Sequence, residues 1–362
     1  MKIKTITCHD VYNLGASLQA YALATYLKTC NHDVQIIDYK PEYLSRHYSL
    51  TAVPNPRFDR AVLRELYLLA KLPGRLKARR SKRKQRFDAF REEYLPLTKE
   101  RYRSSEELRA NCPEADVYIA GSDQIWNPVF PNGKDPAFFL EFVPEDRQKI
   151  SYAASFSVDM LSEEDRQRIQ PWLSRLDAIS VRESSGLRLL NEMGLAGAQV
   201  MDPVFLLEKE SWESLAFRPN AQGYILVYDF DNSPLMRKLA AALADRTGKK
   251  IISVFPVEGA DEVWADMGPR EFLGAIMNAD IVLSNSFHAT AFSLIFQREF
   301  YVINREEKIN TRMRDLLESV SQEERLISDI PAAVETVNWS EVQFWLNHLI
   351  AQSKALLNNN IR

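Results

Sequence analysis

Short apolar segments alternate with segments of helical periodicity along most of this sequence, in two successive series. The first series opens with residues 3–7, which alternate as a strand does, followed by a helical pattern over 17–30 and an apolar run over 34–38. The second opens with the apolar run 224–228 and a helical pattern over 233–247. Alternating strands and helices favour a parallel sheet with helices on both faces. The sequence therefore predicts an α/β fold with two Rossmann-like domains.

Later segments continue both series, and the 362 residues fit about two domains. Further predicted strands are 116–120, 149–153, 178–181, 199–201, 251–255, 280–283 and 299–303, and further helices are 58–72, 162–173, 184–193, 269–277 and 287–296. Segment 208–222 is polar, contains proline and is irregular, so we interpret it as a linker. The N-terminal domain would span 1–207 with a basic helical insertion at about 57–93, the C-terminal domain 223–335, and one or two helices at 336–362 could cross back onto the N-terminal domain.

Residues 71–91 are unusually basic, with ten Lys or Arg against a single acid, Asp88. Such a run is often a solvated helix face, and that interpretation stays open. The preceding amphipathic pattern over 58–72 gives a second interpretation, peripheral contact of 71–91 with an anionic membrane. Nucleic acid is not an expected partner, because no aromatic-rich basic groove accompanies the charge and the net charge is -3.

Cysteine usage and the missing targeting signals point to the cytoplasm. Cys8, Cys30 and Cys112 lie far apart without a Cys-x-x-Cys pair, which fits a reducing compartment. The first residues lack the apolar core of a signal peptide, and no run reaches the roughly 18 apolar residues of a membrane span. We expect a cytoplasmic protein, either free or peripheral at the inner face of the membrane. The sequence does not indicate its oligomeric state.

Several common catalytic motifs are missing. No His-Glu-x-x-His motif occurs, so no metal is expected. The lack of Gly-x-Ser-x-Gly and Walker motifs argues against serine hydrolases and P-loop kinases, and the lack of Gly-x-Gly-x-x-Gly argues against a dinucleotide site.

Polar residues at strand-to-helix junctions are the candidate site residues, because ligands bind beyond the carboxyl ends of strands in open parallel sheets. Five such clusters occur, at residues 13–19, 120–128, 152–157, 180–186 and 284–292. Each of the first four has a structural alternative that stays open.

The first and third clusters combine small and polar residues. Next to Asn13, Gly15 permits close backbone approach, and Ser17 can cap the following helix and leave amide groups free for an anion. The alternative is a capped helix with a turn glycine. Small residues around Ser155 fit either a strand end packed near a ligand or plain close packing.

The second cluster combines polar groups with a tryptophan. Donors and acceptors suited to sugar hydroxyls come from Ser122, Asp123, Gln124 and Asn127, while Trp126 offers an apolar plate for a pyranose ring. The alternative is an Asx-type turn followed by a proline.

The last two clusters provide a cation and a histidine. Arg182 follows a buried-type strand, where it could hold a phosphate or carboxylate, or else form an ion pair with Glu183 or Asp202. His288 alone among five histidines falls at a strand-to-helix junction of the second domain. That position favours acid–base chemistry over a structural role.

In their order along the chain, the five clusters resemble the polysaccharide pyruvyl transferase family. The motifs are Asn-Leu-Gly-Ala-Ser-Leu-Gln, Ala-Gly-Ser-Asp, Tyr-Ala-Ala-Ser, Val-Arg-Glu and Ser-Phe-His-Ala, and the resemblance covers about residues 1–320. Residues 202–204 and 310–312 also resemble family positions.

This resemblance implies two Rossmann-like domains that face a cleft, similar to GT-B glycosyltransferases. It also implies transfer of an enolpyruvyl unit from phosphoenolpyruvate to two hydroxyls of a sugar, which gives a cyclic ketal. The acceptor would belong to a surface polysaccharide or its lipid-linked precursor. Phosphoenolpyruvate is then the donor substrate, and no cofactor is implied.

The resemblance further implies roles for individual residues. His288 would be the catalytic residue, either as the proton donor or as the acid that holds the phosphate, and Arg182, Asn285 and Ser286 would bind the donor's anionic groups. Acceptor-binding or cleft-lining positions would be Asn13, Gly15, Ser17, Ser122, Asp123, Gln124, Trp126, Asn127, Ser155, Asn310 and Arg312.

Ser286 is a departure, because several family members have Arg two residues before the matching histidine. Arg305, Arg312 and Arg314 are candidates to supply that cation instead. Two other functions stay open: a GT-B-type glycosyltransferase that uses a nucleotide sugar, and a non-catalytic glycan-binding protein of a synthesis complex.

Overall fold

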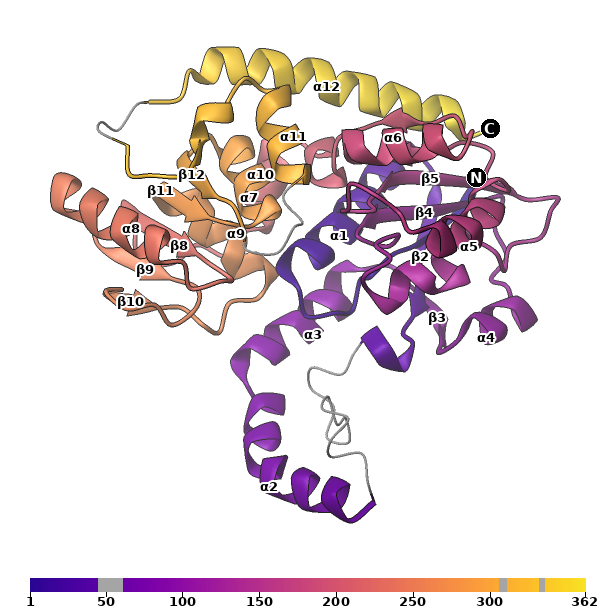
Figure 1. The fold of residues 1–362 in the computed structure, drawn as a ribbon, viewed down its shortest axis with the longest axis horizontal. Helices are drawn as coiled ribbons and strands as arrows, with labels where there is room; N and C mark the ends of the chain where they lie inside the picture. Colours follow the sequence, from indigo (N-terminus) through magenta and orange to yellow (C-terminus); the bar gives the residue numbers. More distant parts are fainter. Residues whose placement is uncertain (45–60, 306–310, 332–335) are drawn as a thin grey trace.

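A computed structural model describes residues 1–44, 61–305, 311–331 and 336–362, and within these ranges the chain forms two parallel sheets flanked by helices (Figure 1). The first sheet has seven strands in the order β3-β2-β1-β4-β5-β6-β7, and the second has six in the order β10-β9-β8-β11-β12-β13. Every pair of neighbouring strands is parallel. The predicted α/β fold with two Rossmann-like units is confirmed.

Most strands lie close to where the apolar runs predicted them, but the strands at 97–102, 262–263 and 326–327 were not predicted. In the first sheet they are β1 (Lys2–Ile6), β2 (Asp33–Tyr39), β3 (Leu97–Tyr102), β4 (Val117–Asp123), β5 (Gln148–Ala154), β6 (Ser180–Val181) and β7 (Ala198–Gln199). In the second they are β8 (Tyr224–Tyr228), β9 (Ile251–Ser253), β10 (Glu262–Val263), β11 (Ala279–Ser284), β12 (Glu299–Ile303) and β13 (Leu326–Ile327). All five residues of β8 are buried, as expected for a central parallel strand covered on both faces.

Helices connect the strands. They are α1 (Leu14–Thr29), α2 (Ala61–Arg79), α3 (Lys82–Tyr94), α4 (Ser105–Ala110), α5 (Glu163–Leu173), α6 (Ser184–Glu192), α7 (Lys209–Leu215), α8 (Pro234–Thr247), α9 (Pro269–Asn278), α10 (Phe287–Phe296), α11 (Thr311–Ser319) and α12 (Trp339–Asn360). Short 3-10 turns include η4 (Pro136–Phe139) and η5 (Pro203–Leu206).

One continuous apolar core joins the two sheets. It contains Leu18 of α1, Phe272 of α9 and Phe292 of α10, all buried. Trp212 lies at its centre, with ring centroids 5.7 Å from Tyr21 and 5.0 Å from Phe292. Trp212 belongs to α7, so segment 208–222, which we interpreted as an irregular linker, contains a helix packed into this core.

The basic insertion forms two helices with different surroundings. Helix α2 projects away from the rest of the protein (Figure 1), whereas α3 packs against α1 and α9. Phe87 and Phe90 are the buried residues of α3, and the edge strand β3 follows it.

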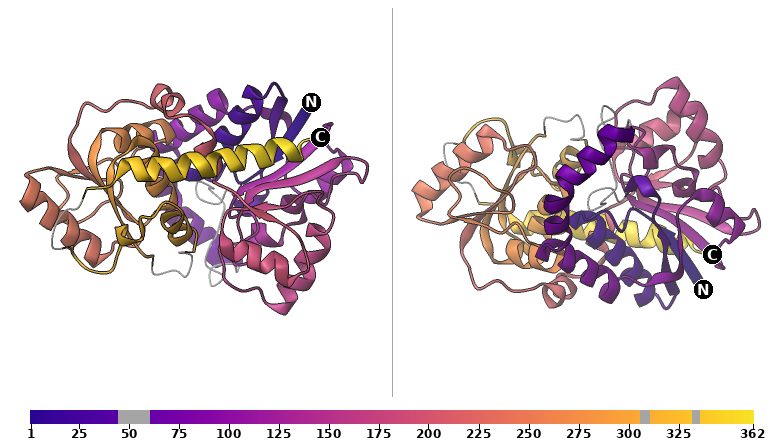
Figure 2. Two further views of the ribbon diagram at one scale, coloured as in Figure 1. Left: turned by 90° about the horizontal axis from the view of Figure 1, so that it is seen from above. Right: turned by 90° about the horizontal axis from the view of Figure 1, so that it is seen from below.

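The C-terminal segment forms a single long helix, α12, that lies across both halves (Figure 2, in yellow). Its last turns contact the first half of the protein: the Nδ2 of Asn358 donates to the hydroxyl of Tyr26 in α1 at 3.1 Å, and the Ser353 hydroxyl accepts from the amide of Met201 at 3.0 Å. The segment before it contacts the second sheet, because the amide of Val337 donates to Glu299 at 3.1 Å.

Candidate active site

A cavity of about 380 Å³ lies between the two sheets. The carboxyl ends of β1, β4, β8, β11 and β12 approach it, which is where open parallel sheets bind ligands. The first half contributes Cys8, Val11, Asn13, Leu44, Asp123, Gln124, Phe130 and Asn132, and the second contributes Phe230, Asn285, Ser286, Phe287, His288, Arg305, Arg312 and Met313.

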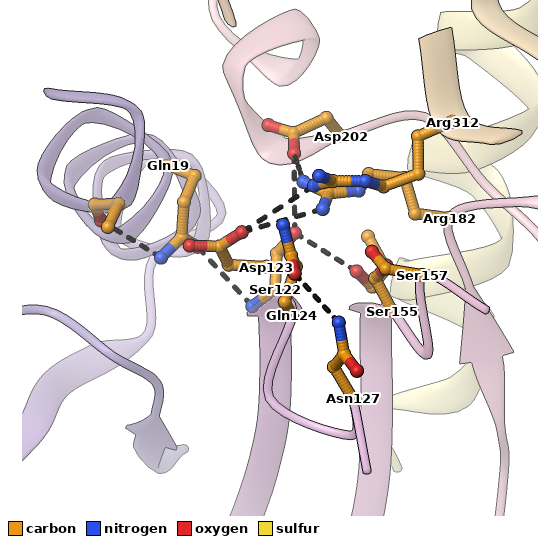
Figure 3. Close-up of polar contacts among 12 residues, drawn as sticks. Gln19, Ser122, Asp123, Gln124, Asn127, Ser155, Ser157, Arg182, Asp202 and Arg312 are labelled. Atoms are coloured by element: carbon orange, nitrogen blue, oxygen red, sulfur yellow. Dashed lines mark hydrogen bonds and ion pairs between the residues drawn. The ribbon is translucent and has the colours of Figure 1, made fainter. Parts of the chain in front are cut away.

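A buried cluster of charged side chains lies beside this cavity (Figure 3), and two of its members, Asp123 and Arg312, line it. The Nη1 of Arg182 lies 2.5 Å from the Oδ2 of Asp202, and the two side chains are only 2% and 0% exposed. The Oδ1 of Asp123 lies 3.5 Å from the Nη2 of Arg182 and 3.8 Å from the Nη1 of Arg312. Both guanidinium groups lie over the ring of Phe287, at 4.8 and 5.7 Å from its centroid.

His288 stands beside this cluster in the first turn of α10. Its Nε2 lies 3.7 Å from the Oδ2 of Asp202, beyond hydrogen-bond distance, and is buried without a hydrogen-bond partner in the described structure. On its other side the imidazole packs against Gly15 of α1, where a Cβ would lie 1.9 Å from the Nδ1 of His288. Only glycine at position 15 leaves room for this ring.

Burial dominates the ionisation of these groups. It lowers the pKa of His288 below its ordinary value, while Asp202 and Asp123 oppose that shift and the two arginines add to it. Burial alone would raise the pKa of Asp123, but the charges of Arg182 and Arg312, joined by that of His288 only when it is protonated, hold this pKa below its usual range. Burial and the neighbouring Arg182 lower the pKa of Arg312 to about 10. Near neutral pH the free protein therefore holds a neutral His288 beside a charged Asp123 and two charged arginines.

The N-terminus of α10 also faces the cavity. Ser286 is its N-cap residue, but its hydroxyl caps no amide. The first-turn amides at 287–289 have no carbonyl partner within the helix, as at any helix start, and they carry a partial positive charge. With Arg305 and Arg312 in the same cavity, this end of α10 is suited to an anion.

Comparison with known proteins identifies the family. A sequence profile of polysaccharide pyruvyl transferase matches residues 13–307. The chain belongs to the polysaccharide pyruvyl transferase family. The match contains all five polar clusters.

Other comparisons are more distant, and no curated protein is significantly similar to the chain. Solved structures with a similar arrangement of the backbone include the UDP-N-acetylglucosamine 2-epimerase from Rickettsia bellii (11% identity, TM-score 0.48, covering 99% of this chain and 95% of that one). The heptosyltransferase WaaC from E. coli is also similar (12% identity, TM-score 0.38, covering 84% of this chain and 88% of that one). Neither similarity bears on the reaction of this pyruvyl transferase family member.

The structure brings together seven of the residues predicted from sequence. Those that line the cavity are Asn13, Asp123, Gln124, Asn285, Ser286, His288 and Arg312. Those that do not line it are Gly15, Ser17, Ser122, Trp126, Asn127, Ser155 and Arg182. Asn310 lies outside the described residues.

Trp126 cannot serve as a plate for a sugar ring, so that prediction was wrong. The indole is fully buried and stacks on Phe139, with ring centroids 5.5 Å apart and planes 7° apart. Its Nε1 donates to the backbone carbonyl of Phe138 at 2.9 Å. Trp126 therefore belongs to the core of the first domain.

Ser17 does not cap the first helix. Helix α1 begins at Leu14, and the Oδ1 of Asn13 accepts from the amide of Ala16 at 3.1 Å. Ser17 lies buried one turn inside. Sequence reasoning placed the start of this helix three residues too late.

Three other polar residues stabilise loops instead of facing the cavity. The Ser122 hydroxyl donates to the carbonyl of Ala153 at 3.0 Å. The Oδ1 of Asn127 accepts from the amide of Val129 at 3.0 Å, which is the Asx-type alternative. The Ser155 hydroxyl donates to Glu183 at 3.0 Å.

Arg182 forms an ion pair with Asp202, which was one of the structural alternatives to a role in ligand binding. It lines a second cavity of about 290 Å³, separate from the first, which Phe287 and Arg312 also line. Arg182 therefore orders the two carboxylates around it, and Arg312 is the cation of the cluster that lines both spaces.

Sequence reasoning missed the exposed aromatic residues of the larger cavity. Phe130 and Phe230 are 41% and 40% exposed and come from opposite halves of the protein. Phe230 lies within Asp229-Phe230-Asp231, directly after β8, a strand-end position of the kind that marked the other clusters. The Nδ2 of Asn285 donates to Asp229 at 2.7 Å and fixes this loop.

Within the described ranges, no three His, Cys, Asp or Glu side chains gather in a group that could hold a metal ion. Within the same ranges, no helix has the length and apolar character to cross a membrane.

The contact between Gly15 and His288 predicts the effect of one added methyl group. Gly15→Ala must push the imidazole away or separate α1 from α10, and such overpacking costs about 1–3 kcal/mol. The free energy of unfolding in urea should fall by that amount. Gly74→Ala is the matched control in α2, where an added Cβ meets nothing within 4 Å. Equal urea midpoints for the two variants would contradict this packing.

The lowered pKa of His288 predicts how stability depends on pH. As the pH drops below about 6.5, this histidine takes up a proton in the unfolded chain before it does so in the folded protein. The free energy of unfolding therefore decreases as the pH decreases. Because His288→Gln lacks this proton, the stability of the wild type relative to the variant should decrease between about pH 7 and pH 5. Urea unfolding at several pH values measures this difference. His348→Gln, on the exposed side of α12, is the control, and a pH-independent difference for His288→Gln would refute the assignment.

Proposed function

We propose that this protein transfers the enolpyruvyl group of phosphoenolpyruvate to two hydroxyls of one sugar in a surface polysaccharide or its lipid-linked precursor. The observation that carries the proposal is a buried His288, whose Nε2 has no hydrogen-bond partner among the described residues, beside Arg312 and the start of α10 in one cavity of a family member. This combination offers a proton carrier next to a site for an anionic donor.

The proposed reaction is a redox-neutral ketal formation. A proton adds to the methylene carbon of the enol, and the central carbon becomes an oxocarbenium-like centre. One sugar oxygen bonds to that carbon, a second sugar oxygen follows, and the bond from the carbon to the phosphate oxygen breaks with its electron pair on phosphate. Of the two hydroxyl protons released, one balances the proton on the new methyl group and the other ends on phosphate.

His288 is the proposed proton carrier. In the free protein its lowered pKa keeps it neutral. A bound donor would add several negative charges to the cavity, which favour the charged imidazolium. His288 would then take up a proton as phosphoenolpyruvate binds and deliver it to the methylene carbon, which resolves the conflict between a low pKa and a role as an acid.

The donor's anionic groups would be held at the start of α10. First-turn amides, Arg305 and Arg312 surround this part of the cavity. These two arginines take the place of the Arg that several family members carry where this chain has Ser286. Arg182 would act indirectly, by holding Asp202 and Asp123 in position.

The acceptor would lie against the exposed aromatic residues. Phe130 and Phe230 offer apolar faces suited to sugar rings, and the nearby amides of Gln124 and Asn132 suit sugar hydroxyls. A lipid-linked acceptor would place the reaction at a membrane surface, so we also propose a cytoplasmic enzyme peripheral to the inner face.

Calorimetric titration with phosphoenolpyruvate tests the donor and the histidine together. Titrations near neutral pH in two buffers of different ionisation enthalpy should show uptake of about one proton on binding. His288→Gln should bind without that uptake, and Arg312→Gln should bind about 10- to 100-fold more weakly, a loss of about 1.4–2.8 kcal/mol.

Arg188→Gln is the control for these titrations, because Arg188 lies on the exposed surface and pairs with Asp159. Binding of a nucleotide sugar but not of phosphoenolpyruvate would replace the proposal with glycosyl transfer. Binding of neither, with a glycan still bound, would favour a non-catalytic role.

The aromatic pair predicts the acceptor side separately. On an array of immobilised bacterial oligosaccharides, Phe130→Ala and Phe230→Ala should each weaken binding about tenfold, because each ring contributes roughly 1 kcal/mol or more. The affinity of Phe130→Ala for phosphoenolpyruvate should be unchanged, whereas Phe230 also contacts the guanidinium of Arg305, 5.1 Å from its ring centroid. Phe344→Ala removes a similarly exposed ring on α12, away from the cavity, and should bind like the wild type. Wild-type glycan binding by both cavity variants would exclude this acceptor surface.

A further inference from the structure

Helix α2 is exposed over its whole described surface. From residue 64 to residue 80 no side chain is buried, and the helix projects from the protein beneath the junction of the two halves (Figure 1; Figure 2, right). Leucine side chains that stay largely in water on such a helix need another explanation than packing in a core.

The helix is amphipathic. Leu66, Leu69 and Leu76 recur at helical spacing and are 59%, 66% and 38% exposed. At 100° per residue they share one face, and Arg64 and Lys71 lie on the opposite face. A leucine stripe in water opposite a basic face is typical of helices that lie in the plane of a membrane interface.

The basic segment 71–91 is divided between α2 and α3, and its charged side chains have different partners in the two helices. In α3 the cations bind the protein itself: Arg83 donates to the carbonyl of Met267 at 3.1 Å, and Arg86 pairs with Glu271 at 3.1 Å. Among the ion pairs between described residues, none involves Arg64, Lys71, Lys77, Arg79 or Arg80. Of the basic segment 71–91, only the part that lies in α2 therefore remains a candidate for contact with a membrane.

We infer that α2 is a docking element for an anionic lipid surface, with its leucine face inserted and its basic residues at the headgroups. Residues 64–80 carry six Lys or Arg and one acid in a chain whose net charge is -3. This charge contrast would orient the protein with α2 toward a negative surface. Nucleic acid would use the cations alone and leave the leucine stripe in water.

Few contacts separate α2 from the cavity. Helix α3 follows directly, and its Asp88 accepts from the hydroxyl of Tyr12 at 3.0 Å. The ring of Tyr12 also packs on Phe87, with centroids 5.8 Å apart. Tyr12 precedes Asn13, a residue of the cavity wall. The inference itself is independent of the chemistry proposed for the cavity, because lipid binding needs no substrate.

Vesicle sedimentation of the full chain tests the inference. Vesicles of phosphatidylcholine mixed with phosphatidylglycerol should bind the protein at least tenfold better than vesicles of phosphatidylcholine alone, and added salt should weaken the binding. Leu66→Glu with Leu69→Glu should reduce binding at least tenfold, and so should Lys71→Glu with Arg64→Glu.

Matched controls separate this effect from net charge and from misfolding. Lys238→Glu with Lys250→Glu makes the same charge change on the exposed surface of the second half and should leave vesicle binding near the wild-type level. All variants should keep the wild-type melting temperature and affinity for phosphoenolpyruvate. Equal vesicle binding by the wild type and both α2 variants would overturn the inference, as would a lack of binding to anionic vesicles. Retained vesicle binding without donor binding would instead refute the proposed reaction alone.

Discussion

The buried ion pair between Arg182 and Asp202 is the constraint on which the site depends. Two charges removed from water are tolerated only where other groups satisfy them, and Asp202 also accepts from the amide of Val204 at 3.1 Å. Asp123 approaches Arg182 from a third segment. The pair thus fixes the ends of β4 and β6 and the start of η5 relative to one another. His288 meets a cluster whose charges are already largely matched, so burial keeps it neutral.

Most of the fold could be predicted from sequence, because central parallel strands are covered on both faces and appear as unbroken apolar runs. The predicted segments 224–228, 287–296 and 299–303 coincide with β8, α10 and β12. Edge strand β3 was not predicted, because its exposed Lys99 and Glu100 interrupt the apolar pattern. Helix α7 was missed because only Trp212 and Leu215, within an otherwise polar segment, anchor it to the core.

The candidate site was predictable only in part, because strand ends can be located from sequence but side-chain burial cannot. Asp123 and His288 follow β4 and β11 and do line the cavity. Trp126 lies in the same kind of loop, yet its burial depends on Phe139, which comes from a separate turn. The position of Gly15 against His288 joins residues that are far apart in the chain, and local pattern carries no information on such a contact.

The hydrogen bond from the amide of Met201 to Ser353 has a consequence for the order in which the chain assembles. Met201 adjoins Asp202, and its amide is buried by a helix whose partner residue is made 152 residues later. Until residue 353 has emerged, that amide must bond to water, and the segment that holds Asp202 stays open to solvent. The charge cluster can therefore reach its final, water-free arrangement only after residue 353 has been made, so a fragment released earlier would hold the strands of both sheets without a finished site.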